Sequence, residues 1–182
     1  MTTRRMKASG LGLMVAGAVA SLAFLPLIAI SATDNAPLNL SGAVAANVDV
    51  TVTGTAIAAT LDLSTNHTET SLKVADVTEM ANTPAGYTVS VASANLAAGG
   101  RCGGAAGQAC FWNSAGTEDV AFTLLKGASS LTFSGSSVQW SDTTAVQLTA
   151  LASVANIAYA VGATILPQGT YTEALTFTIT SK

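Results

Sequence analysis

Hydrophobic and polar residues alternate along most of the chain with a period of two. This spacing is typical of a β-strand that buries one of its faces. Three runs show it clearly, at residues 48–52, 87–91 and 120–124, where Val, Tyr, Phe or Leu occupies every second position. The pattern predicts three half-buried strands.

The same alternation is most regular near the C-terminus, at residues 170–180. Threonine holds most positions of one parity there. The other parity carries large apolar side chains, so the segment predicts a further strand whose core-facing residues are Tyr171, Leu175, Phe177 and Ile179.

Short clusters of Gly, Pro, Ser and Asn separate these runs at 84–86, 99–100, 113–116, 134–136 and 167–169. Frequent short strands joined by such turns predict an all-β sandwich or barrel. Residues 143–172 carry no charge, and residues 145–166 are apolar enough to resemble a membrane-spanning helix. Their β-branched pairs and interspersed polar residues favour strands instead.

The composition fits one folded domain after a leader. Only 9% of the 182 residues are charged and 49% are hydrophobic, which excludes intrinsic disorder. Arg4, Arg5 and Lys7 precede a charge-free apolar stretch at 11–30, and small residues follow at 29–32. These features predict a helical signal peptide at 1–32; the alternative is an uncleaved membrane anchor.

Removal of the leader changes the charge balance. Four basic and ten acidic residues remain, a formal net charge of −6. We therefore expect neither nucleic acid nor an anionic membrane as a partner, and no stable membrane insertion after cleavage.

The two cysteines, Cys102 and Cys110, lie on and beside a glycine-rich stretch at 99–107. Export places them in an oxidising compartment, so we expect one disulfide bond. No metal site is expected, because His67 is the single histidine and no second cysteine pair exists. The sequence indicates no cofactor.

No catalytic residue is predicted. His67 lies in the polar stretch 64–69, which is typical of a solvated loop. No serine lies in the glycine-flanked pattern of a nucleophile elbow. Trp112 and Trp140 suggest either sugar-stacking platforms or, as we expect, residues packed on the core.

The segment that follows the leader keeps one parity for longer than a usual strand. Two interpretations stay open: a body strand from about residue 47 preceded by an extended arm at 33–46, or one long bent edge strand. The apolar positions of the arm are Leu38, Leu40, Gly42, Val44 and Ala46.

The leader, this arm, the segment 85–95 and the ending 166–179, with Pro167-Gln168-Gly169-Thr170-Tyr171-Thr172 before the last strand, carry a resemblance. Together they resemble subunits of chaperone–usher pili, in particular the archaic branch that includes spore-coat-U-like proteins. The resemblance implies an immunoglobulin-like antiparallel β-sandwich at 47–182 that lacks one strand. The chain departs from the family pattern because both cysteines lie mid-chain rather than near the start of the body.

The resemblance also implies how the protein works. A periplasmic chaperone would fill the groove left by the missing strand until the arm of the next subunit replaces it at an outer-membrane usher. Leu38, Leu40, Val44 and Ala46 would insert, with Gly42 where the groove is narrow.

We therefore expect a non-enzymatic, exported subunit of a bacterial surface fibre or pilus, which passes through the periplasm to the cell surface and supports adhesion or biofilm. The second hypothesis is a self-complete secreted adhesin or carbohydrate-binding sandwich, and the third is a secreted hydrolase.

Overall fold

The computed structural model describes residues 41–99, 101–115 and 117–182. The predicted signal helix at 1–32 and the arm residues 33–40 lie outside the described residues. Residues 43–182 form one compact unit.

Antiparallel strands dominate the unit, as the alternation predicts. The elements in chain order are β1 (Val48–Gly54), the 3-10 helix η1 (Ala56–Ala59), β2 (Thr68–Ala81), β3 (Tyr87–Ser93), α1 (Ala94–Ala97), β4 (Ala109–Asn113), β5 (Glu118–Lys126), β6 (Ser129–Leu131), β7 (Ser137–Asp142), β8 (Gln147–Ala160), β9 (Tyr171–Thr172) and β10 (Leu175–Ser181).

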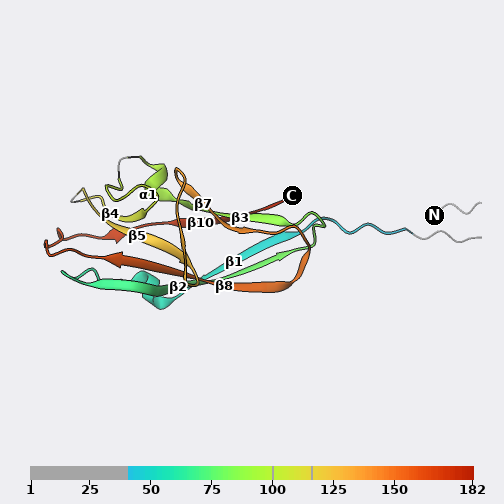
Figure 1. Ribbon diagram of the computed structural model, residues 1–182, viewed down its shortest axis with the longest axis horizontal. Coiled ribbons are helices and arrows are strands. Elements are labelled where there is room, and N and C mark those ends of the chain that lie inside the picture. The colour runs from blue at the N-terminus through green and yellow to red at the C-terminus, as the bar shows by residue number, and fades with distance from the viewer. Residues whose placement is uncertain (1–40, 100, 116) are drawn as a thin grey trace, which may run out of the picture. The chain divides into compact units, whose positions relative to one another are not determined.

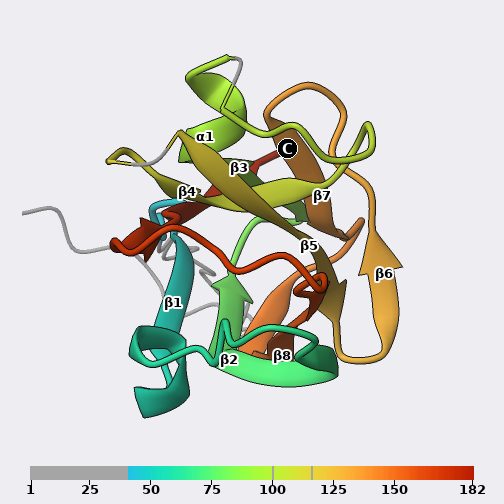
Figure 2. The same ribbon diagram turned by 90° about the vertical axis from the view of Figure 1, so that its left-hand side faces the viewer.

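The strands form two sheets that face each other as the layers of a sandwich (Figures 1 and 2). The larger sheet has the order β1-β2-β8-β5-β4-β9, with β6 beside β5, and the smaller has the order β10-β3-β7. The order β1-β2-β8-β5 opposite β10-β3 matches the A-B-E-D and F-C order of an immunoglobulin domain. The predicted all-β, immunoglobulin-like sandwich is confirmed.

The core forms where the apolar parities of the two sheets meet. Tyr87, Val89 and Val91 of β3 are fully buried, and they face Phe122 and Leu124 of β5, which are also buried. The Phe111 and Phe122 rings stack with their centroids 4.6 Å apart. Aromatic residues supply much of the apolar area that stabilises a core with so many alanines and valines.

The expected single strand at 170–180 is in fact two strands in different sheets. Tyr171 and Thr172 form β9, which pairs with β4 of the larger sheet, whereas Leu175 begins β10, which pairs with β3 of the smaller sheet. Glu173 lies at the crossing. Its carboxylate accepts hydrogen bonds from the backbone amides of Ala94, at 2.9 Å, and Ala174, at 2.8 Å. These bonds anchor the chain where it leaves one sheet for the other.

The charge-free segment contains a strand, as we expected, since β8 runs for 14 residues. No helix within the described residues is long and apolar enough to cross a membrane. The sequence analysis missed β2, which is equally long, because charged residues interrupt its alternation.

One of those charged residues is completely buried. The Glu79 carboxylate accepts hydrogen bonds from the Tyr87 hydroxyl, at 3.0 Å, and from the Ser141 hydroxyl, at 2.7 Å. The Lys126 ammonium lies 3.8 Å from it. Burial and the neighbouring carboxylate raise the pKa of Tyr87 to about 12. These side chains come from both sheets, so the cluster links the two layers through the core.

The predicted disulfide joins Cys102 to Cys110, whose Cα atoms are 5.5 Å apart. It ties the loop after α1 to β4, where Cys110 is fully buried.

Replacing both cysteines with serine is expected to lower the free energy of unfolding by about 2–3 kcal/mol, because the unfolded chain loses a cross-link that closes a short loop. Chemical denaturation of the oxidised protein and the variant measures the difference. Intact-mass analysis of the wild type should show two hydrogens gained on reduction, and two alkylatable thiols in unreduced protein would contradict the bond.

Candidate functional site

The most distinctive feature of the sandwich is an opening between two strand edges. Within the described residues, β1 ends one sheet and pairs only with β2, while β10 ends the other and pairs only with β3. β1 and β10 lie near each other, but no hydrogen bond among the described residues joins their backbones. Two neighbouring edges thus present unpaired N–H and C=O groups, which are binding sites for an additional strand.

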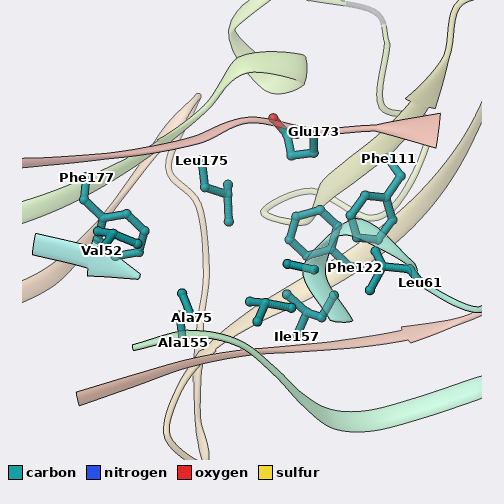
Figure 3. A pocket seen from close by; sticks show the side chains of 12 residues that line it. Val52, Leu61, Ala75, Phe111, Phe122, Ala155, Ile157, Glu173, Leu175 and Phe177 are labelled. Atoms are coloured by element: carbon teal, nitrogen blue, oxygen red, sulfur yellow. The ribbon is translucent and has the colours of Figure 1, made fainter. Parts of the chain in front are cut away.

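An apolar groove lies between these two edges and opens toward the core (Figure 3). Its volume is about 190 Å³. The lining residues come from both sheets and from η1 and the loop after it: Val52, Ala58, Leu61, Val74, Ala75, Phe111, Phe122, Ala155, Ile157, Glu173, Leu175 and Phe177.

The floor and the rim of the groove differ in burial. Phe122, Ala155 and Ile157 form a buried floor. On the rim, Val52 is 43% exposed, and Leu175 and Phe177 are only half-buried. The sandwich therefore leaves part of its own core open along β1 and β10.

This opening explains the burial of the residues predicted as the core of the last strand. Leu175, Phe177 and Ile179 do pack against the core, but β10 is a sheet edge and each of the three is only half-buried. Phe177 still packs edge-to-face against Trp140, with the ring centroids 5.2 Å apart. Tyr171 lies in β9 instead and is half-buried.

Glu173 is the only charged residue among the described residues that line the groove, and its carboxylate is already engaged. Besides the two amides described above, the Ser93 hydroxyl donates to it at 2.8 Å. Consequently this described lining offers apolar surface and strand edges, without a free charge.

A second cleft continues the groove. It shares Ala58 and Leu61 with the groove and extends between η1 and the loop before β9, where it is lined by Leu63, Leu166, Pro167, Gln168 and Tyr171, among others. The groove therefore adjoins this cleft at the end of the sandwich that carries these two loops.

The described part of the arm lies outside both sheets. Gly42, Val44 and Ala46 are exposed, Val44 by 89%, and no strand precedes Val48 among the described residues. Leu38 and Leu40, the other predicted inserting residues, lie outside the described residues.

Asn82, which the sequence analysis did not select, holds the base of the arm. Its side chain donates to the Ala45 carbonyl at 2.8 Å and accepts from the Asn47 amide at 2.6 Å. Its backbone amide donates to the Asn47 carbonyl at 3.0 Å. No sequence signal marks this role, because the contact joins residues 35 or more positions apart.

His67 lies in a loop, as expected, but it is only half-buried rather than fully solvated and has partners that the sequence did not reveal. Its ring is half-buried between Asp62, at 3.3 Å, and Glu69, at 3.1 Å. Ser64 donates to Asp62 and lowers the pKa of that carboxyl. The hydrogen bonds described for the ring reach no hydroxyl or thiol, so this cluster lacks the base–nucleophile pair of a hydrolytic triad.

The tryptophans do not form a joint platform for a sugar. Trp140 is buried beneath β10, as expected for a core residue, and the Lys126 ammonium lies 5.3 Å from its ring centre. Trp112 is half-buried on β4. Among the described residues, no group of three or more His, Cys, Asp or Glu side chains is arranged to hold a metal ion.

No family model and no curated protein matches the chain. Among solved structures, it is similar to the E. coli Hda pilus minor tip subunit HdaB, with 16% sequence identity and a TM-score of 0.39. The similarity covers 74% of this chain and 84% of that one.

Proposed function

We propose that the protein is an exported structural subunit of a surface fibre, and that its arm fills the groove of another copy by β-strand donation. The observation that carries the proposal is the apolar groove bounded by the unpaired edges of β1 and β10. An inserted strand would pair with these edges and cover the open side of the core.

The arm has the chemistry of such a strand. Its apolar parity, Leu38, Leu40, Gly42, Val44 and Ala46, would face the groove floor, while Asn39 and Ser41 would face solvent. Ten residues, 37–46, extend to about 33 Å, and a seven-residue strand such as β10 to about 23 Å, so the arm is long enough. In its own subunit Val44 packs in neither sheet, which fits a segment used elsewhere.

Several finer points belong to the same proposal. Residues 1–32 direct export, 33–46 form the arm and 47–182 the body. A periplasmic chaperone covers the groove in transit, an usher exchanges it for the arm, and the assembled fibre supports adhesion at the cell surface. A self-complete adhesin would instead fold the arm into its own sheet.

Mixing two variants of the full chain tests the proposal. Leu40→Asp disables the arm but leaves the groove intact, whereas Val52→Asp places a charge on the rim of the groove and leaves the arm intact. Each variant alone should stay monomeric, because a carboxylate in an apolar site costs several kcal/mol. Together they should form a one-to-one pair that cannot grow, since each member supplies only one functional half.

Analytical ultracentrifugation of the separate and mixed variants distinguishes these outcomes. Ser41→Asp and Thr53→Asp are the matched controls, because they place the same charge on the opposite parity of arm and rim; both should assemble like the wild type. A mixture that stays monomeric would contradict strand donation, as would wild-type protein that remains a monomer.

A further inference from the structure

The base of the arm is surrounded by exposed apolar side chains that the sandwich does not use. Leu148 is 70% exposed, Val146 45% and Met80 37%. Met80 and Leu148 border a small cavity together with Asn47 and Asn82, the residues that hold the arm, and Val146 lies two positions before Leu148. We name Met80, Val146 and Leu148 the root patch.

The pairing of β1 with β2 and of β2 with β8 brings the base of the arm close to the root patch. Val48 at the start of β1 pairs with Ala81 of β2, which in turn pairs with Gln147 of β8. The pairing between β2 and β8 shifts between Glu79 and Ala81, so β8 bulges at this point and Leu148 is turned toward solvent. Figure 1 shows the start of β1, which the arm precedes, at this end of the body next to the β2–β3 and β7–β8 connections.

The hydrogen bonds of Asn82 fix the base of the arm to its own body. Asn82 binds the Ala45 carbonyl and the Asn47 amide, so residues 45–47 stay attached to their own body. Residues before Ala45 are then free to enter another groove, and Ala46 can occupy only its mouth, next to the donor's own body. With no flexible linker between the donated strand and the body, the body of the donor must abut the acceptor where the strand enters.

We infer that the arm enters the groove at the end where the second cleft adjoins it. The groove borders the second cleft at Ala58 and Leu61, which line both, and Leu63, Leu166 and Pro167 add apolar surface to this cleft. Nearby Ile165 is 81% exposed. An arm that enters at this end would bring the root patch of its own body against these residues.

We propose that the second cleft of one copy binds the root patch of the next, as a body-to-body contact additional to the inserted arm. The partner is therefore a second copy of this chain. The two surfaces differ, so the contact is heterologous and repeats head to tail without closing. This inference rests on the proposed function and adds to it a rigid joint between subunits.

The pair formed by the two variants provides the test, because donor and acceptor are chemically distinct in it. Leu148→Asp added to the donor, which carries Val52→Asp, should weaken the pair by roughly tenfold or more, since an apolar contact is replaced by a charge. The same change added to the acceptor, which carries Leu40→Asp, should have no effect. Ala59→Arg, in the second cleft, should show the reverse dependence.

Sedimentation equilibrium of the parent pair and the four substituted pairs measures these affinities, and circular dichroism confirms that each chain is folded. A donor Leu148→Asp that binds like its parent, or that weakens the pair equally from either side, would overturn the inference while leaving strand donation intact. Failure of the parent pair to form would instead contradict the proposed function.

Inserting Gly-Ser-Gly-Ser between Ala46 and Asn47 of the donor separates the two contacts. The inserted residues form a flexible linker between the arm and the body, which Asn82 otherwise holds together. The arm should still bind the groove, but donors with and without the Leu148→Asp substitution should now bind equally well. A difference in affinity that persists with the long linker would show that Leu148 acts through its own body, against the inference.

Discussion

Replacing Leu40 with aspartate in the full chain is expected to weaken association of the protein with itself by at least roughly a hundredfold. The substitution forfeits about 1.5–3 kcal/mol of apolar burial and adds the cost of an unpaired carboxylate in an apolar groove. Each 1.4 kcal/mol changes an association constant by about tenfold, so the combined loss exceeds two such steps.

The same experiment decides between a donated arm and an integral edge strand. If the arm is donated, the Leu40→Asp monomer should keep the melting temperature of a dissociated wild-type monomer, because residue 40 contributes nothing to its own body. Ser41→Asp should change neither association nor melting. A self-complete wild-type monomer whose melting temperature falls with Leu40→Asp would contradict the donated arm and favour the adhesin.

Replacing Glu79 with alanine should give the largest loss of stability, about 3–5 kcal/mol. The carboxylate is fully buried, and it accepts hydrogen bonds from the hydroxyls of Tyr87 and Ser141 in the opposite sheet. Its removal leaves these donors without an acceptor and the Lys126 ammonium without its nearby carboxylate, and it opens a void between the sheets. A domain of this size has only about 5–15 kcal/mol in total, so much of its stability depends on this residue.

The Leu40→Asp background suits this measurement, because assembly does not then obscure the unfolding transition. Urea denaturation of Glu79→Ala in that background should show the loss. Glu118→Ala, which removes an exposed glutamate at the start of β5, is the matched control and should change stability by less than about 0.5 kcal/mol. Equal effects of the two substitutions would contradict a structural role for the buried cluster.

Local pattern alone determined the class of the fold. The alternation in β1, β3 and β5 is visible in the sequence because one face of each strand is apolar and the other is polar or small. The disulfide was equally predictable, since the two cysteines lie eight positions apart on a glycine-rich segment and the sequence offers neither of them another cysteine as a partner. These features depend on residues that are close together in the chain, so they can be predicted from the sequence.

Other features were decided only by tertiary structure. The sequence predicts one strand at residues 171–179, but the chain changes sheets at Glu173, whose carboxylate accepts hydrogen bonds from the amides of Ala94 in α1 and of Ala174. Glu79 interrupts the apolar positions of β2, so the strand could not be recognised from alternation. The charge is tolerated in the core because the hydroxyls of Tyr87 and Ser141, from the other sheet, donate hydrogen bonds to the carboxylate. A carboxylate that would mark a solvent-exposed position thus occupies one of the most buried positions.

One part of the candidate site could be predicted from the sequence, and the other part was decided only by the tertiary structure. The sequence could mark the apolar parity of the arm, since that is a local alternation, but it could not show the groove, whose walls come from strands far apart in the chain. Val52 and Phe177 line one groove only because two sheet edges meet without pairing. Asn82 holds the arm only because β2 ends beside the start of β1. Local alternation therefore determined which segments form strands, and long-range packing decided which of their edges remain open for a partner.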